Sequence, residues 1–392
     1  MAGVWSFTFY FLLLGGYAFA LPYLVLYYQS AGFSGVQIGI LTGISPLITM
    51  LGASLWSALA DATRRHRLIM SVALLVGSLS LLAFPFLHTF LPILLLAILF
   101  YIFYGPVSSL ADSASMYMLA DKKEMYGRVR LGGTIGFGIA AILAGVVVQG
   151  YGLRLAFWGG AILLLLAFFS SQKLTHNPQV VKEPTSREIV RLLRNPRWIL
   201  FLCLAFAGGL SLAGTNTYLF PYLKELGAKE TTMGLALAMG TISEIPVFFY
   251  GHHLVRRFKP FGLLILAMAF TGLRLLAFAA ASTPELVLLV QLLNGLTFPA
   301  MWIAGVAYAD ENAPAGLSAT AQGMFNAMVF GFGAAVGGFA GGPLMESSGG
   351  QGTYTVFGTA VLAILVMVLL YQRRLPKEGL AAANVVEETR GP

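Results

Sequence analysis

Charged residues and cysteines are what this chain has least of. Only 10% of its 392 residues are charged, and Cys203 is its single cysteine. Soluble domains carry about 25% charged residues, so the composition argues against a soluble enzyme, a nucleic-acid-binding protein and a disordered chain. One cysteine in an apolar run cannot supply a disulfide framework or a cysteine metal cluster. We therefore expect neither a metal nor a cofactor.

Long apolar runs fill most of the chain, since 58% of its residues are hydrophobic. A membrane-spanning helix needs about 20 such residues. Polar and turn clusters divide the chain into twelve runs, at 5–29, 35–60, 68–87, 91–118, 131–150, 154–171, 198–224, 231–254, 261–281, 285–309, 315–345 and 352–372. The runs are continuous, not alternating as in outer-membrane barrels. The sequence predicts an all-α membrane protein with twelve transmembrane helices.

The basic residues predict the orientation of these helices. With the N-terminus inside, 20 of the 24 Lys and Arg residues fall on the cytoplasmic side, while Arg154, Lys224 and Lys229 fall outside and Arg274 lies within a span. Lys and Arg are enriched in cytoplasmic loops. We expect a multi-pass protein of the inner (cytoplasmic) membrane with both termini in the cytoplasm. The first run is too long for the apolar part of a signal peptide, so we expect no cleavable signal.

The longest polar stretch between spans divides the chain into two halves of six spans. The sequence predicts an N-terminal six-helix bundle at 1–171, a cytoplasmic linker at 172–197, a C-terminal six-helix bundle at 198–372 and a cytoplasmic tail at 373–392. The basic linker is suited to lie on anionic lipid headgroups.

The two halves resemble each other at a constant offset of 195 residues. Gly32 and Gly39 in the first half match Gly227 and Gly234 in the second, and the Gly-Phe-Gly of 136–138 matches that of 331–333. Internal repeats of this kind are typical of transporters in which two bundles rock about a central site. We therefore expect two bundles related by a pseudo-two-fold axis.

Ionisable residues inside spans are the most informative side chains. Each costs about 2.5–3.5 kcal/mol on insertion scales and is a functional candidate by default. Asp112, Glu244 and Arg274 lie within spans, and the depths of Glu244 and Arg274 allow an ion pair. Such a pair serves proton or substrate handling, or it only neutralises two buried charges. Arg130 begins a span and either reaches for the headgroups or faces the site.

Polar residues in two further spans predict the wall of a cavity. Gln291, Asn294 and Thr297 are three residues apart and share one face of a helix. Trp302 lies on the same span, and Asn216 lies on the seventh. Polar faces of spans point more often into a bundle than to lipid. These residues either line a substrate path or make ordinary hydrogen bonds between helices.

A charged cluster follows the second span. Asp61 is followed by Arg64, Arg65, His66 and Arg67. Such a cluster can lock two bundles together, and we take Asp61 and Arg65 as candidates for a gating loop. It can also serve only as an orientation signal.

Over its whole length the chain resembles the major facilitator superfamily. The likeness rests on the six-plus-six layout, on the basic loop after Asp61 and on the matching loop after Gly251. That superfamily usually has a glycine four residues before the aspartate, where this chain has Ser57. The resemblance implies two bundles and transport by alternating access.

A narrower resemblance is to the oligosaccharide–proton symporters, typified by the lactose permease. It rests on Tyr126-Gly127-Arg128-Val129-Arg130 and the glycine-rich stretch 133–138. The resemblance implies that Arg130 binds sugar, that Asp112, 18 residues earlier, assists it, and that Phe137 stacks on the substrate. The phrase at 243–246 and the segment around Arg274 are closer to the phenylpropionate-permease-like branch.

The chain departs from that family in its tenth span. Asn294 and Thr297 stand where the permease has a His and a Glu for proton handling, so proton coupling falls on Asp112 or on Glu244, with Arg274 as partner. We predict a monomeric secondary transporter that moves a small polar solute, a sugar or related metabolite, together with H⁺. The alternatives are a proton-coupled exporter of drugs or metabolites and a non-transporting receptor. The spans contain no His–carboxylate constellation that an intramembrane enzyme would need.

Overall fold

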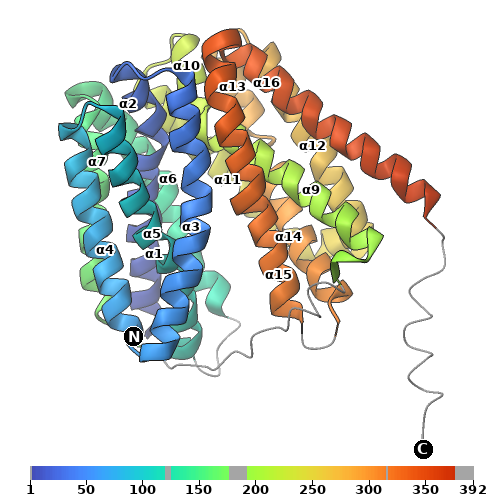
Figure 1. The fold of residues 1–392 in the computed structure, drawn as a ribbon, viewed down its shortest axis with the longest axis horizontal. Coiled ribbons are helices and arrows are strands. Elements are labelled where there is room, and N and C mark those ends of the chain that lie inside the picture. The colour runs from blue at the N-terminus through green and yellow to red at the C-terminus, as the bar shows by residue number, and fades with distance from the viewer. Residues whose placement is uncertain (1, 120–124, 176–191, 315–316, 376–392) are drawn as a thin grey trace, which may run out of the picture.

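The computed structural model describes residues 2–119, 125–175, 192–314 and 317–375, and throughout these ranges the regular structure is helical (Figure 1). The long helices of the first half are α1 (Ala2–Ala20), α3 (Gly35–Thr63), α4 (His66–Ala83), α5 (Phe90–Leu119), α6 (Tyr126–Tyr151) and α7 (Arg154–Ser171), with the short α2 (Leu24–Ser30) after α1. The second half contains α9 (Pro196–Leu212), α10 (Leu219–Glu225), α11 (Glu230–Phe258), α12 (Pro260–Ala280), α13 (Pro284–Gln291), α14 (Asn294–Asn312), α15 (Ser318–Asn326) and α16 (Ala334–Arg374).

The expected twelve crossings are present. Eleven apolar helical stretches in the described ranges are long enough to span a membrane, and the last of them, Thr320–Arg374, contains two crossings. Gly349 joins these two with a φ of 63°, a left-handed conformation that glycine adopts without a steric penalty. The prediction of an all-α membrane protein is thus confirmed.

Several spans that the sequence suggested as continuous are interrupted. The first has a 3₁₀ turn at Leu21–Tyr23, and π-helical turns occupy Ala213–Thr217 and Ala327–Gly333. The tenth breaks between α13 and α14, where Leu292 and Leu293 donate to carbonyls three residues back. Such a break changes which side chains share a face, and π turns occur frequently at functional sites.

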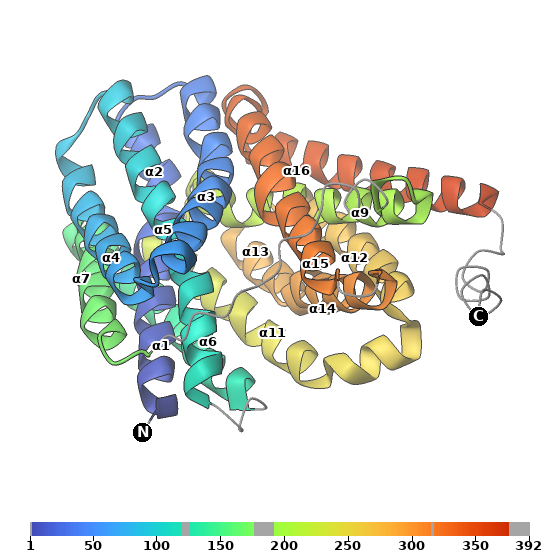
Figure 2. The same ribbon diagram turned by 60° about the horizontal axis from the view of Figure 1, so that its bottom comes forward.

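The helices form two bundles that lie side by side (Figures 1 and 2). In the first, α1 packs on α6 and α7, α3 packs on α5, and α4 packs on α7. In the second, α16 packs on α9 and α12, and α14 packs on α11 and α12. Large apolar side chains such as Leu55, Phe249 and Leu370 remain exposed on the outside, as expected for surfaces that contact lipid.

The bundles meet along two seams, α3 with α16 and α6 with α11. Glycines allow the backbones to approach closely there. A Cβ atom at Gly39 would lie 2.7 Å from the carbonyl oxygen of Phe339, and one at Gly342 would collide with the carbonyl oxygen of Gly35. Any larger residue would therefore force the two helices apart.

Hydrogen bonds join the bundles along the same seams. Thr42 Oγ1 lies 3.0 Å from the carbonyl oxygen of Gly338, and Thr231 Oγ1 lies 2.7 Å from Gln149 Oε1. Both contacts belong to the half of the molecule away from the N-terminus. At the N-terminal end, α3 and α15 diverge (Figure 1). The bundles are therefore joined at the end away from the N-terminus, which we call the closed end, and we call the end where the backbones of α3 and α15 diverge the open end.

Candidate functional site

A cavity of about 210 Å³ lies between the two bundles. Its wall is formed by residues of α1, the 3₁₀ turn at Leu21–Tyr23, α6, α9, α11, α14 and the two π-helical turns: Leu14, Tyr17, Pro22, Thr134, Phe137, Leu212, Asn216, Leu237, Thr241, Glu244, Asn294, Phe298 and Phe330. Both bundles contribute, so a solute in this cavity contacts both halves. A concave site lined by apolar groups and a few polar ones is the usual form of a small-molecule site.

The rings on the cavity wall form two pairs, one in each bundle. Tyr17 of α1 and Phe137 of α6 have ring centroids 6.0 Å apart. In the second bundle, Phe298 of α14 and Phe330 of the second π turn are 6.4 Å apart. Phe137, which the family resemblance singled out, therefore lies at the cavity with a ring partner that the sequence did not indicate.

The polar groups of the wall come mainly from the second bundle. Asn216, Thr241, Glu244 and Asn294 belong to it, while the first bundle contributes the two hydroxyl-bearing residues Tyr17 and Thr134. Glu244 is the single charged residue among these lining side chains. The cavity thus has one hydrogen-bonding wall with one carboxylate.

Glu244 and Arg274 do not form the direct ion pair that the sequence suggested. Asn294 lies between them: its Nδ2 donates to Glu244 Oε1 at 2.6 Å, and its Oδ1 accepts from Arg274 Nη1 at 2.6 Å. The predicted depths allow the two residues to approach each other, but the amide of Asn294, the first residue of α14, lies in the gap. The carboxylate and the guanidinium are thus connected by two hydrogen bonds to this amide.

Arg274 is enclosed within the second bundle and is only 4% exposed. It donates to Thr297 Oγ1 at 3.1 Å and to Gln291 Oε1, and its guanidinium lies 5.2 Å from the ring centre of Phe278. Gln291, Asn294 and Thr297 therefore converge on Arg274, although only Asn294 also reaches the cavity. A buried cation held by neutral oxygens is costly unless every donor is satisfied.

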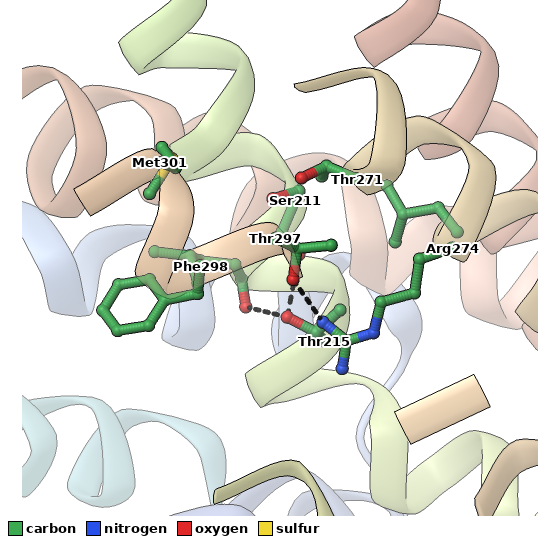
Figure 3. A pocket seen from close by; sticks show the side chains of 9 residues that line it. Ser211, Thr215, Thr271, Arg274, Thr297, Phe298 and Met301 are labelled. Carbon is green, nitrogen blue, oxygen red and sulfur yellow. Dashed lines mark hydrogen bonds between the residues drawn. The ribbon is translucent and has the colours of Figure 1, made fainter. Parts of the chain in front are cut away.

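A second, much smaller cavity adjoins Arg274 inside the second bundle (Figure 3). It is lined by Ser211, Leu212, Thr215, Thr271, Arg274, Leu275, Thr297, Phe298 and Met301 and has room for about one water molecule. Arg274 Nε is buried and makes no hydrogen bond to the part of the chain that the structure describes. This polar space shares Leu212 and Phe298 with the central wall and is too small for a solute.

Asp112 and Arg130 are neighbours, as the family resemblance implied. Arg130 Nη1 lies 2.7 Å from Asp112 Oδ1 and 3.3 Å from Tyr126 Oη, and Tyr10 Oη donates to the same Asp112 oxygen at 2.5 Å. Helix α6 begins at Tyr126, not at 131, so Arg130 lies within the helix. Neither Asp112 nor Arg130 lines the central cavity. Arg130 precedes Phe137 by seven residues, about 10 Å along α6 toward the open end.

The other predicted site residues separate into those at the cavity and those beside it. Asn216 is exposed and lines the cavity, whereas Thr297 is buried against Arg274. Trp302 does not reach the cavity wall. Its ring centroid lies 5.5 Å from that of Phe325 and 5.4 Å from that of Phe330. Trp302 therefore supports the ring of Phe330 from behind.

The charged cluster after the second span lies at the open end. Asp61 Oδ1 is 2.7 Å from Nε2 of His66, the first residue of α4. Arg65 precedes α4 at its N-cap position and is exposed. In the described ranges no group of three or more His, Cys, Asp or Glu side chains is arranged to hold a metal ion.

Sequence reasoning missed several cavity residues, namely Tyr17, Thr241, Phe298 and Phe330. Aromatic side chains are frequent here, with 29 Phe and 16 Tyr residues, so a single ring carries little signal. Phe330 lies one residue before the Gly-Phe-Gly at 331–333 that marks the internal repeat. The repeat was the one available pointer to that part of the wall.

Two helical bundles that share a cavity with a few polar groups in its wall, and that are joined at one end, are the architecture of a membrane transporter of the major facilitator type. A family model described as "MFS_1 like family" matches residues 5–356. The chain belongs to this family and is a multi-pass membrane transporter of small solutes.

The comparisons agree along almost the whole chain. The maltose permease of Geobacillus stearothermophilus is 27% identical over 93% of this chain and 93% of its own length. The transporter YwbF of Bacillus subtilis (strain 168) is 24% identical over 88% of this chain and 86% of its own. The crystal structure of the nucleoside transporter NupG covers 94% of this chain and 98% of its own, with a TM-score of 0.83 and 20% identity. That last likeness establishes the fold alone.

Proposed function

We propose that this protein is a proton-coupled symporter that takes up a small polar solute, a sugar or related metabolite, by alternating access. One observation carries the proposal: Glu244, the charged residue of the cavity wall, is linked through Asn294 to the buried Arg274. The name of one similar protein, a maltose permease, supports a hydroxylated solute.

Of the two candidate carboxylates, Glu244 is better placed to exchange a proton. Asp112 contacts the guanidinium of Arg130 directly and accepts a hydrogen bond from Tyr10, and both contacts stabilise its ionised form. Glu244 accepts from the neutral amide of Asn294 and meets Arg274 only through it. A proton on Glu244 therefore removes a charge that has no direct counter-ion, and this residue carries H⁺ in our proposal.

Coupling follows from the shared use of Asn294. Closing the bundles around an ionised Glu244 would bury that charge at a large cost. A proton removes the cost and turns the carboxyl into a donor for a solute hydroxyl. The solute then bonds to Glu244, Asn294 and Asn216 and stacks on Phe137. Proton and solute together favour the closed cavity, which is the differential affinity that a population shift requires.

The remaining site residues receive roles according to their places. Arg130 lies about two turns of α6 from Phe137, toward the open end, and Asp112 of α5 is its partner there. In our proposal a solute passes this pair on its way between the cavity and the open end. Thr297 holds Arg274, and Trp302 supports the aromatic wall. Asp61 and Arg65, at the open end, take part in closing it when the cavity faces the other side.

The moving parts in this proposal are the two bundles, 1–171 and 198–372, joined by the linker 172–197 and followed by the tail 373–392. The distribution of Lys and Arg supports a cytoplasmic location for both termini, and the bacterial relatives support the cytoplasmic membrane. With that orientation, the open end faces the cytoplasm and the structure is inward-open.

Directional transport in reconstituted vesicles tests the proposal. Purified protein is placed in liposomes with an imposed pH gradient, and uptake of radiolabelled maltose and uridine is followed. Accumulation that moves with protons and disappears with a protonophore is expected for a symporter. Movement of the solute against the proton flow would make the protein an exporter and overturn the proposal.

A further inference from the structure

The charge on the cavity wall limits which solutes can bind, if the cavity holds the solute as proposed above. Glu244 is acidic, and no Lys or Arg lies among the lining residues that the structure describes. The guanidinium of Arg274 is buried and is covered on the cavity side by Asn294, and Arg130 is already paired with Asp112 away from the wall. A phosphate or carboxylate placed here would lose its hydration without gaining a cation. The cavity therefore selects a neutral solute.

Most of the wall is apolar, so a fully hydroxylated solute would have to place hydroxyl groups against apolar side chains. Besides the two pairs of rings, Leu14, Pro22, Leu212 and Leu237 line the cavity. A disaccharide has hydroxyl groups around its whole edge, and those that faced these side chains would lose their hydrogen bonds to water without replacement. A solute with hydroxyl groups at one end and an apolar plane at the other avoids this penalty.

Both bundles contribute aromatic rings to the wall, and these rings are suited to contact such a plane. Tyr17 and Phe137 belong to the first bundle, and Phe298 and Phe330 belong to the second. When the bundles approach each other around a solute, aromatic side chains come toward it from both sides. Stacked or edge-to-face contacts with a flat ring then add to the hydrophobic gain.

We infer that the solute is a neutral glycoside that carries a flat unsaturated ring, such as a nucleoside or an aryl glycoside. Its sugar hydroxyls bond to Asn216, Glu244 and Asn294. Its ring lies between the pair Tyr17–Phe137 and the pair Phe298–Phe330. This inference rests on the proposed function and narrows it to one class of solute.

Matched probes separate the two features, ring and charge. The ring is tested by 4-nitrophenyl β-D-glucopyranoside against methyl β-D-glucopyranoside, and the charge by uridine against uridine 5′-monophosphate. Each is titrated into purified protein, and the rise in Tm gives an apparent Kd, because a ligand of the folded state stabilises it. We expect at least one ring-bearing neutral probe to bind at least about tenfold more tightly than its partner.

Variants then locate the ring. Tyr17→Leu and Phe137→Leu should reduce the ratio between the aryl and the methyl glucoside, whereas a merely structural role would weaken both sugars equally. Phe86→Leu is the matched control, since Phe86 is 68% exposed and is not part of the wall. It should leave the ratio unchanged.

Defined outcomes overturn the inference. It fails if methyl glucoside or maltose binds as tightly as 4-nitrophenyl glucoside and uridine, or if uridine 5′-monophosphate binds as tightly as uridine. It also fails if neither 4-nitrophenyl glucoside nor uridine binds. Binding with these ratios but without proton-driven uptake would support this inference and overturn the proposed symport. Proton-driven uptake of maltose alone would support the proposed symport and overturn this inference.

Discussion

The carboxylate of Glu244 and the guanidinium of Arg274 are held apart by one amide, that of Asn294, which bonds to both at 2.6 Å. The negative charge of Glu244 on the cavity wall is therefore connected to the positive charge of Arg274 only through a neutral side chain. This arrangement also gives a solute in the cavity direct access to the group that connects the two charges. If this connection couples solute and proton, changes at Asn294 and Glu244 should affect coupling where changes elsewhere do not.

Replacing Asn294 should uncouple transport. Asn294→Ala leaves Glu244 without its donor and removes one acceptor of Arg274, so we expect a stability loss of about 1–3 kcal/mol and no pH-driven accumulation. Gln291→Ala is the control: it removes another acceptor of Arg274 but no bond to Glu244. It should lower Tm similarly and keep the coupling. Equal loss of coupling in both variants would contradict the role of Asn294.

Asn294→Asp gives a sharper test of the same amide. The new carboxylate can still accept from Arg274, but it cannot donate to Glu244 and places a second negative charge beside it. We expect Tm to be retained better than in Asn294→Ala, while pH-driven uptake is lost. Undiminished proton-driven accumulation in this variant would show that the donor to Glu244 is dispensable.

Removing the Asp112–Arg130 pair should affect rate more than coupling. The two side chains are 37% and 45% exposed, so water screens their attraction and Asp112→Asn should cost less than about 1 kcal/mol. We expect slower uptake with the final pH-driven accumulation preserved. Initial rates and plateau levels in vesicles separate the two effects. A lowered plateau with normal passive exchange would assign the proton to Asp112.

The closed seam should open when a side chain is placed in it. Gly342→Leu would collide with the backbone of Gly35, so we expect it to shift the protein toward the state that is open at the opposite end. Ile38 is buried beside these two glycines. In an Ile38→Cys, Cys203→Ser background, Gly342→Leu should then speed the reaction of the new thiol with an impermeant maleimide.

Gly150→Leu is the control for this labelling experiment, because a Cβ there meets nothing within 4 Å. It should leave the labelling rate of the same background unchanged. An equally unchanged rate in Gly342→Leu would mean that the contact between Gly342 and Gly35 does not keep this end closed.

The sequence was sufficient for the fold and for part of the site. Twelve apolar runs predict the transmembrane helices, and the family resemblance at Asp112 and Arg130 predicts that these two residues are neighbours. It was not sufficient for the geometry around Arg274. Gln291, Asn294 and Thr297 all accept from Arg274, but only Asn294 also lines the cavity, and their spacing of three residues does not show this difference.

The aromatic wall was harder to foresee for a different reason. A ring such as that of Tyr17 reaches the cavity because two bundles are brought together, and that arrangement is a property of the tertiary structure. Nothing in the local pattern of α1 distinguishes Tyr17 from Tyr10, which instead bonds to Asp112. The cost of burying a charge marks Glu244 and Arg274 in the sequence, and the family resemblance marks Phe137 among the rings.

The most direct test of proton transfer by Glu244 is Glu244→Gln, which keeps the shape of the side chain and removes its charge. With whichever ring-bearing probe binds, this variant should still exchange labelled for unlabelled solute across vesicles but should not accumulate it in response to a pH gradient. Glu311→Gln, which alters an exposed carboxylate outside the cavity wall, should behave as the unmodified protein. Full pH-driven accumulation by Glu244→Gln would contradict the central claim that Glu244 carries the proton.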